Sequence, residues 1–225
     1  MDKAIVIFSG GQDSSSCLFY AINNYDEVIA LTFNYKQRHE KEVRIAKNII
    51  KKIRENFNYN TKITHKILDI DVFKNLNSSL INHDLNIEDA EEREKDYPNT
   101  FVPGRNMIFL NIGAIVAYNH NIKDIYTGVN QADYSGYPDC RLEFIQSMEE
   151  TLELAFDYSF NIKTPLINLT KDEIWEFVYK IGEKEFKLVK EKSLTCYNGI
   201  VGRGCGECPA CKLRNKGLKK FIKRK

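Results

Sequence analysis

The sequence predicts an α/β protein built on a doubly wound parallel sheet, and three observations lead to this fold class. Short apolar runs rich in β-branched residues alternate with stretches whose apolar residues recur at helical spacing. The first run stops at a Gly-Gly pair, as a buried parallel strand does where it enters a turn. Hydrophobic residues make up 43% of the 225 residues and charged residues 28%, which excludes collagen, low-complexity disorder and a disulfide mini-protein.

The first third of the chain reads as a β-α-β unit followed by a helix and a third strand. Residues 3–8 (KAIVIF) and 28–33 (VIALTF) are typical of buried strands. Between them, the apolar residues of 14–25 fit a helix packed on a sheet. Residues 38–56 predict an amphipathic helix, and 62–68 alternates as a strand.

The middle of the chain begins with a long segment that lacks periodicity. Asn, Ser, His and an acidic cluster fill residues 75–104, which predicts a functional loop. The very apolar stretch 105–119 predicts a helix buried on most sides and a candidate subunit contact. Residues 124–129 read as the next strand, and a loop at 130–140 precedes a helix at 141–155.

Towards the C-terminus, one helix start and one basic segment stand out. Residues 170–173 (TKDE) form a capping box that opens a helix. The formal net charge of +2 is too balanced for a nucleic-acid surface over the whole protein. Residues 212–225 nevertheless hold eight basic residues and no acidic one, and we predict a solvated, partly amphipathic helix rather than a nucleic-acid contact.

The chain carries no membrane or secretion signal that we can recognise. No stretch approaches the ~20 apolar residues that cross a bilayer. The apolar run near the N-terminus is shorter than the roughly 7 to 15 residues of a signal-peptide core. We therefore expect a cytoplasmic protein with no membrane partner.

The loop SGGQDS at residues 9–14 lies between the first strand and the first helix. Its glycines let the backbone approach a ligand, and the amides from Gly10 to Ser15 can form an anion nest backed by the helix dipole. Asp13 can orient the loop or help hold Mg²⁺. The Walker A Lys-Ser/Thr and the GxGxxG spacing are both missing, which excludes kinases and hydride-transfer enzymes. The loop predicts a pyrophosphate site, and the alternative is a tight turn without a ligand.

Four of the six cysteines crowd into sixteen residues near the C-terminus. Four thiolates at this spacing, separated by glycines, can surround a tetrahedral ion. We assign zinc, with an iron–sulfur cluster as the competing interpretation and free thiols as the weaker one. Since sulfur would fill all four positions, the zinc would be structural. These cysteines are Cys196, Cys205, Cys208 and Cys211.

The other two cysteines and the four histidines give weaker evidence of a functional site. Cys17 lies on an apolar helix, where a buried small side chain is the expected role. Cys140 stands between Asp139 and Arg141, and although a neighbouring cation can lower a thiol pKa, we favour a structural role. The four histidines are scattered, and His39 alone lies in a segment that merits a test.

Six segments together resemble one known family. The SGGxDS loop resembles the PP-loop of ATP pyrophosphatases, which have a Rossmann-like fold. The others resemble the 7-cyano-7-deazaguanine synthase family of PP-loop enzymes, over a region from residue 3 to about 218. Lys36 stands where that family usually has Gly, and Ser15 and Ser16 follow the loop where hydroxyl residues are usual. The further segments are YKQRH (35–39), TFVPGRN (100–106), TGV (127–129), DYSGYPDCR (133–141) and LTCYNG (194–199).

The resemblance implies an ATP-dependent ligase of queuosine biosynthesis. Such an enzyme converts 7-carboxy-7-deazaguanine and ammonia to the nitrile 7-cyano-7-deazaguanine through an adenylated acid and an adenylated amide, releasing AMP and diphosphate. The resemblance also implies ATP with Mg²⁺, one structural zinc and a homodimer. We expect a PP-loop ATP-binding α/β domain over residues 1–185 and a four-cysteine zinc-binding segment with the basic tail over 186–225.

The resemblance and the expected crevice at the strand ends give candidate site residues. The strand end at 31–35 is expected near adenine, and Arg105 and Lys171 are candidates for phosphate or carboxylate contact, with a surface ion pair as the alternative for each. The deazaguanine would meet Asp133, Tyr137, Asp139 and Arg141, unless this loop is a plain turn. ATP would lie along Phe8, Ser9, Gly10, Gly11, Gln12, Asp13, Ser14, Ser15, Ser16, Cys17 and Leu18.

Two other functions stay open from the residues. One is a different PP-loop activity, such as tRNA thiolation or amidation; a thiolase would normally require a reactive cysteine. The other is a zinc-stabilised RNA-binding module, which the cysteine cluster and the basic tail would form. The residues do not identify the group that transfers protons in the ligase reaction.

Overall fold

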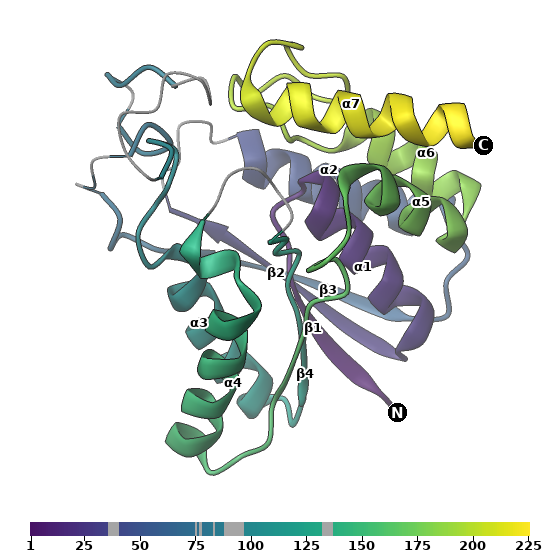
Figure 1. The fold of residues 1–225 in the computed structure, drawn as a ribbon. Helices are drawn as coiled ribbons and strands as arrows, with labels where there is room; N and C mark the ends of the chain where they lie inside the picture. The colour runs from purple at the N-terminus through teal and green to yellow at the C-terminus, as the bar shows by residue number, and fades with distance from the viewer. Residues whose placement is uncertain (36–40, 75, 77, 83, 88–96, 132–136) are drawn as a thin grey trace.

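The computed structural model describes residues 1–35, 41–74, 76, 78–82, 84–87, 97–131 and 137–225. Its centre is a sheet of five parallel strands in the order β3-β2-β1-β4-β5 (Figure 1). The strand order reverses between β1 and β4, and such a switch point opens a ligand crevice at the carboxyl ends of the strands. The strands are β1 (Lys3–Ile7), β2 (Glu27–Asn34), β3 (Lys62–Asp69), β4 (Asp124–Tyr126) and β5 (Asn161–Lys163).

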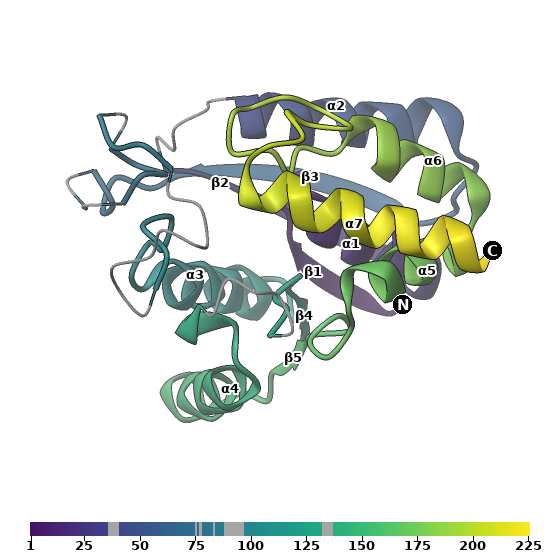
Figure 2. The ribbon, with the colours of Figure 1, turned by 45° about the horizontal axis from the view of Figure 1, so that its top comes forward.

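Helices cover both faces of the sheet, so the predicted doubly wound α/β fold is confirmed. They are α1 (Gln12–Asn24), α2 (Lys41–Asn56), α3 (Arg105–Asn119), α4 (Leu142–Phe156), α5 (Lys171–Ile181), α6 (Glu183–Lys192) and α7 (Pro209–Arg224). Figure 2 shows α3 and α4 on one side of the sheet and the other helices on the opposite side.

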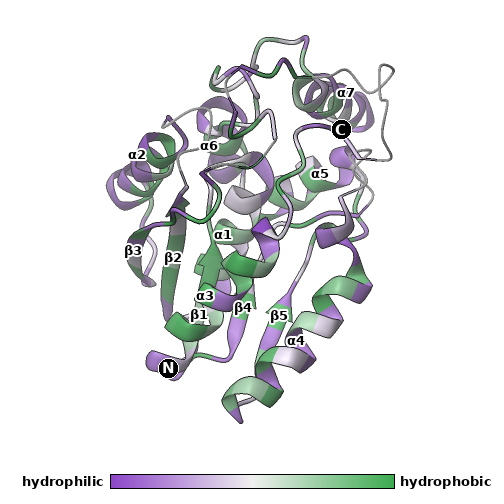
Figure 3. Ribbon diagram, turned by 90° about the vertical axis from the view of Figure 1, so that its left-hand side faces the viewer, coloured by the Kyte–Doolittle hydropathy of each residue, from purple (hydrophilic) through white to green (hydrophobic). Residues whose placement is uncertain are grey.

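The core consists of two apolar layers, one on each face of the sheet. Ala4 and Val6 of β1 belong to the layer shared with α1, α2, α5, α6 and α7. Ile5 points the other way, into the layer shared with α3 and α4. Because β1 is buried on both faces, its sequence is a continuous run of hydrophobic residues. Figure 3 shows hydrophobic residues along the central strands.

The sequence did not predict two elements, the short strand β5 and the charged helix α6. The strand β5 has three residues, too few to produce a periodic pattern, and it forms through pairing with β4. The helix α6 has the charged sequence EKEFKLVKEK, in which Leu188 and Val189 alone are buried. The expected strand at 124–129 also ends early, at Tyr126, because the chain then turns towards the start of α1.

Helix α3 has the predicted bounds, but the prediction that it is buried on most sides is wrong for the single chain. Its buried residues are Leu110, Gly113, Ala114 and Ala117, which lie on one side. Met107, Ile115 and Tyr118 are 43%, 49% and 47% exposed. No helix in the described part of the chain is long and apolar enough to span a membrane.

The predicted capping box is confirmed, and the basic tail forms the predicted helix but is not solvated throughout. The backbone N–H of Thr170 donates to Glu173 Oε2 at 2.7 Å, which completes the capping box of α5. The basic tail forms most of α7, which is amphipathic as expected. The helix is less exposed to solvent than expected, because two of its own residues, Arg214 and Phe221, are buried.

We expect Gly128→Ala to lower the free energy of unfolding by about 1–3 kcal/mol, the usual cost of forcing an extra carbon into a packed site. A Cβ at position 128 would lie 2.9 Å from the carbonyl carbon of Asp13 and from the amide nitrogen of Ser14. Urea denaturation measures the change. Gly11→Ala is the matched control, because its Cβ would meet no atom closer than 3.4 Å. A Gly128→Ala protein as stable as the control would contradict this packing.

Candidate active site

The loop at residues 9–14 follows β1 and opens at the carboxyl edge of the sheet. Gly10 has φ +81°, a left-handed conformation, and a Cβ there would lie 3.1 Å from the Ala46 amide nitrogen of α2. The Ser9 and Ser14 hydroxyl oxygens are 3.0 Å apart, and Ser14 Oγ donates to the Gly11 carbonyl at 3.3 Å. These contacts hold the loop in one shape.

The first turn of α1 presents backbone amides at this edge. Within the described residues, its N-cap Gly11 makes no side-chain capping bond. Uncapped amides at a helix N-terminus attract anions, and the helix dipole reinforces this attraction. The geometry therefore suits the phosphate groups predicted for this loop.

Asp13 and Lys171 meet beside the loop, although they are 158 positions apart in the sequence. Lys171 Nζ donates to Asp13 Oδ2 at 2.7 Å, and the lysine side chain is only 8% exposed. The other carboxylate oxygen, Asp13 Oδ1, is buried and has no hydrogen-bond partner among the described residues. An orphaned carboxylate oxygen beside an anion site fits a Mg²⁺ ligand.

The remaining predicted ATP residues lie beneath the loop. Ser16 Oγ donates to the Gln12 carbonyl at 2.9 Å, and the Cys17 thiol faces the Thr127 carbonyl at 3.8 Å. These side chains support the loop from below, so contact with a nucleotide at these positions would come chiefly from backbone atoms. Five side chains are buried in this way: Phe8, Ser15, Ser16, Cys17 and Leu18.

The segment before the first clustered cysteine lies against the loop. The Leu194 amide donates to the Gly10 carbonyl at 3.0 Å. The Gln12 amide donates to Thr195 Oγ1 at 3.4 Å. The C-terminal cysteine segment is therefore a direct neighbour of the loop at residues 9–14, which we call the phosphate loop.

A second polar cluster surrounds Arg105 at the start of α3. Its half-buried guanidinium lies near the Tyr35, Tyr137 and Asp139 side chains. Burial alone would lower the pKa of Arg105, but the two hydroxyls and the carboxylate together raise it. Arg105 is thus a charged side chain surrounded by groups that stabilise its charge.

Neighbouring residues fix this cluster. The Asn106 amide donates to Asp139 Oδ2 at 3.2 Å, and Asn106 Nδ2 donates to the Asp139 carbonyl at 3.0 Å. Burial raises the pKa of Asp139, although Arg105 and the Asn106 amide act in the opposite direction. Tyr137 lies 2.5 Å, oxygen to oxygen, from Thr100 Oγ1, and it also shares a hydrogen bond with the half-buried Tyr197.

The structure brings together only some of the predicted substrate residues. Arg105, Tyr137 and Asp139 form one cluster, whereas Arg141 is exposed at the N-cap of α4. Asp133 and residues 36–40, with His39, lie outside the described residues. Tyr35, at the strand end expected near adenine, also belongs to this cluster. Three further members had no role predicted from the sequence, although each lies in a segment quoted for the family resemblance. They are Thr100, Asn106 and Tyr197.

The two isolated cysteines have the environment of structural thiols. Burial, with a smaller effect of Asp139, raises the pKa of Cys140 to about 12, and Asn106 Nδ2 contacts its sulfur at 3.4 Å. Burial also raises the pKa of the fully buried Cys17. Both side chains are protonated near neutral pH, which does not suit a nucleophile.

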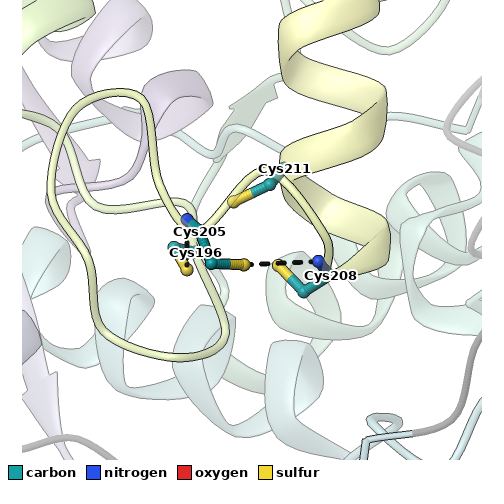
Figure 4. A group of neighbouring side chains, drawn as sticks. All are labelled: Cys196, Cys205, Cys208 and Cys211. Atoms are coloured by element: carbon teal, nitrogen blue, oxygen red, sulfur yellow. Dashed lines mark hydrogen bonds between the residues drawn. The ribbon is translucent and has the colours of Figure 1, made fainter.

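The four C-terminal cysteines converge as their spacing predicts (Figure 4). All four sulfur atoms lie within 4.8 Å of one another, a separation that a tetrahedral ion can bridge. The Cys205 amide donates to Cys196 Sγ at 3.4 Å, and the Cys208 amide donates to Cys205 Sγ at 3.3 Å. Although burial opposes it, the amide donors lower the pKa of Cys205 to about 6, whereas burial raises the pKa of Cys208 and of Cys211. The close approach of the four sulfur atoms fits a site for a metal ion.

Comparison with known proteins gives full-length matches. The sequence matches the family described as "Queuosine biosynthesis protein QueC" over residues 3–222. A protein of Clostridium botulinum (strain 657 / Type Ba4) named 7-cyano-7-deazaguanine synthase is 50% identical over 223 residues, which cover 99% of this chain and 97% of that protein. A protein of the same name from Staphylococcus epidermidis is 47% identical over 225 residues, covering 100% and 95%.

A solved structure supports the fold. The crystal structure of a 4-thiouridine synthetase–RNA complex with bound ATP matches with a TM-score of 0.54 and 21% identity, over 99% of this chain and 50% of that chain. At this identity the likeness concerns the fold alone. From the family match and the two relatives of nearly equal length, the chain belongs to the queuosine biosynthesis protein QueC family.

Proposed function

We propose that this protein is an ATP-dependent ligase that converts 7-carboxy-7-deazaguanine and ammonia to 7-cyano-7-deazaguanine. The observation that carries the proposal is the placement of two sites at one edge of the sheet. Backbone amides at the start of α1 suit a triphosphate, and the half-buried Arg105 suits a carboxylate. Full-length relatives named 7-cyano-7-deazaguanine synthase support the same reaction.

The Arg105 cluster would bind the deazaguanine acid. The guanidinium of Arg105 would pair with the substrate carboxylate and aim it at the α-phosphate. Tyr137 stacks on Phe101, with ring centroids 5.7 Å apart, and offers an aromatic surface for the base. Asp139 is a buried acceptor for a guanine-like N–H or amino group, and Asp133 is proposed for the same role.

The phosphate loop would then support the first activation. The substrate carboxylate attacks the α-phosphorus of ATP, the bond to diphosphate breaks, and an acyl adenylate forms. The amides of residues 10–15 and the Lys171 ammonium would stabilise the charge that develops on diphosphate. Mg²⁺ held through Asp13 would supply further positive charge there. Ammonia then attacks the acyl carbon, AMP leaves, and the amide forms.

A second activation would convert the amide to the nitrile. The amide oxygen attacks the α-phosphorus of a second ATP, and diphosphate leaves again. The nitrogen loses both of its protons while AMP departs with the former amide oxygen, so that the carbon–nitrogen triple bond forms. Because both rounds need the same alignment of an oxygen and an α-phosphate, one phosphate loop serves both.

The reaction itself is the first test of this proposal. We expect purified protein with ATP, Mg²⁺, ammonium and 7-carboxy-7-deazaguanine to give the nitrile and two AMP per molecule, measured by mass spectrometry. Arg105→Met should lower kcat/KM for the acid by at least about 100-fold, because a charged partner of the carboxylate is lost. Arg44→Met, on the exposed side of α2, is the matched control. Amide as the final product, or no ATP cleavage with this acid, would contradict the proposal.

We also propose that the four clustered cysteines hold one structural zinc ion. Four sulfur ligands leave no open position, so the metal would fix the segment beside the phosphate loop rather than take part in the reaction. All six cysteines are free of disulfides, which fits a reducing cytoplasm.

Metal analysis tests this assignment. We expect about one zinc and no iron per chain, and loss of the zinc together with thermal stability in Cys205→Ser, because binding of a structural metal is coupled to folding. Cys140→Ser is the matched control and should keep its zinc. Iron with the visible absorption of an iron–sulfur cluster would overturn the zinc assignment.

We propose a homodimer that covers the exposed apolar side of α3 and α4. Leu154 of α4 is 80% exposed, and Met107, Ile115 and Tyr118 of α3 are each more than two-fifths exposed. Apolar side chains gathered on one side of a soluble protein are typical of a subunit contact. Sedimentation at micromolar concentration should give twice the chain mass, and Ile115→Lys should give the monomer. A wild-type monomer would refute the dimer.

A further inference from the structure

We propose that the basic helix α7 positions Lys171 at the phosphate loop, by fixing the start of α5 from which this lysine extends. The inference rests on the proposed function, because it assigns the lysine to the triphosphate. It also gives the basic tail a role that neither the reaction nor the metal site requires. Figure 2 shows α7 lying beside α5.

The first observation is a close backbone approach between the two helices. Gly217 of α7 sits directly on the first residue of α5. A Cβ at position 217 would lie 2.6 Å from Lys171 Cβ and 2.8 Å from the Lys171 carbonyl carbon. Because only a hydrogen fits there, the position of α7 determines where the backbone of Lys171 lies.

The second observation is a pair of cations from α7 on a buried carboxylate next to Lys171. The Asp172 side chain is only 5% exposed. Lys220 Nζ donates to Asp172 Oδ1 at 3.2 Å, and Arg224 Nη2 forms an ion pair with Asp172 Oδ2 at 2.7 Å. Burial acts to raise the pKa of Asp172, but hydrogen bonds from Lys220 and Thr170 hold it below its ordinary value. Asp172 is therefore an anionic anchor for the end of α7.

The third observation is the buried arginine in the middle of the contact. Arg214 is 1% exposed, and its guanidinium lies 4.9 Å from the ring of Trp175 in α5. Its Nη2 donates to the Lys190 carbonyl at 2.9 Å, and its own carbonyl accepts from Trp175 Nε1 at 3.2 Å. Arg214 thus joins α5, α6 and α7 in one rigid unit.

These contacts form a continuous path from the cysteine cluster to the phosphate loop. Cys208 is the N-cap of α7, so a metal at the cluster would fix the beginning of this helix. Gly217, Lys220 and Arg224 connect α7 to the first turn of α5, and Lys171 in that turn contacts Asp13. The same basic residues are engaged within the protein, which favours positioning over RNA binding.

The test compares two charge-matched double variants. Lys220→Met with Arg224→Met removes both cations from Asp172. The control, Lys219→Met with Lys223→Met, removes two exposed lysines of the same helix that form no ion pair with Asp172 among the described residues. Emission of Trp175, the single tryptophan, shows whether α7 stays docked in each variant.

The first readout needs no catalysis. Lys171 is nearly buried in the wild type, so an amine reagent such as acetic anhydride should label it slowly. We expect labelling, followed by mass spectrometry, to rise several-fold in the Lys220/Arg224 variant and to stay at the wild-type rate in the control. Equal labelling in both variants would overturn the inference whether or not the proposed ligase activity is found.

The second readout is turnover. We expect kcat for diphosphate release to fall about ten-fold in the Lys220/Arg224 variant, with a smaller change in the KM for ATP, because misplaced catalytic groups slow the chemical step. In a Lys171→Met background the same pair of substitutions should cause no further loss. A further loss in that background, or an equal loss in the control, would overturn the positioning role. An inactive wild type would contradict the proposed function instead.

Discussion

The close packing around the loop after β1 is the constraint on which the rest of the site depends. Other segments pack against this loop and fix its shape, and the amides at the start of α1 are thereby fixed at the edge of the sheet. Ala46 of α2 touches Gly10, the turn at Gly128 touches Asp13, and Leu194 donates a hydrogen bond to the Gly10 carbonyl. Three parts of the chain that are remote in sequence thereby hold one short loop open at the edge of the sheet.

Two positively charged side chains, Lys171 and Arg105, lie near the carboxyl edge of the sheet. Lys171 is a nearly buried cation and Arg105 a half-buried one, and each lies beside carboxylates or hydroxyls. Cations fixed in this way can stabilise developing negative charge without first reorganising water. Lys171 lies beside the loop and Arg105 at the start of α3, and we propose that a carboxylate and an α-phosphate are aligned between them. Little covalent chemistry is then required of the protein.

The sequence predicted those parts of the molecule whose signal is local. The strands β1 and β2, the phosphate loop, the capping box at Thr170 and the four cysteines each carry their pattern within a few residues. The parts that were missed depend on distant partners. The strand β5 forms only beside β4, and burial of α7 depends on the fit of Gly217 against Lys171. The apolar composition of α3 likewise predicted where the helix begins and ends, but not which side of it is buried.

The central claim is that the phosphate loop and the Arg105 cluster form one active site. A crystal structure with a non-hydrolysable ATP analogue and 7-carboxy-7-deazaguanine tests it most directly. We predict phosphate oxygens on the amides of residues 10–15, and the substrate carboxylate within hydrogen-bonding distance of Arg105 and facing the α-phosphate. A substrate bound away from Arg105, or a nucleotide bound elsewhere on the sheet, would contradict the account.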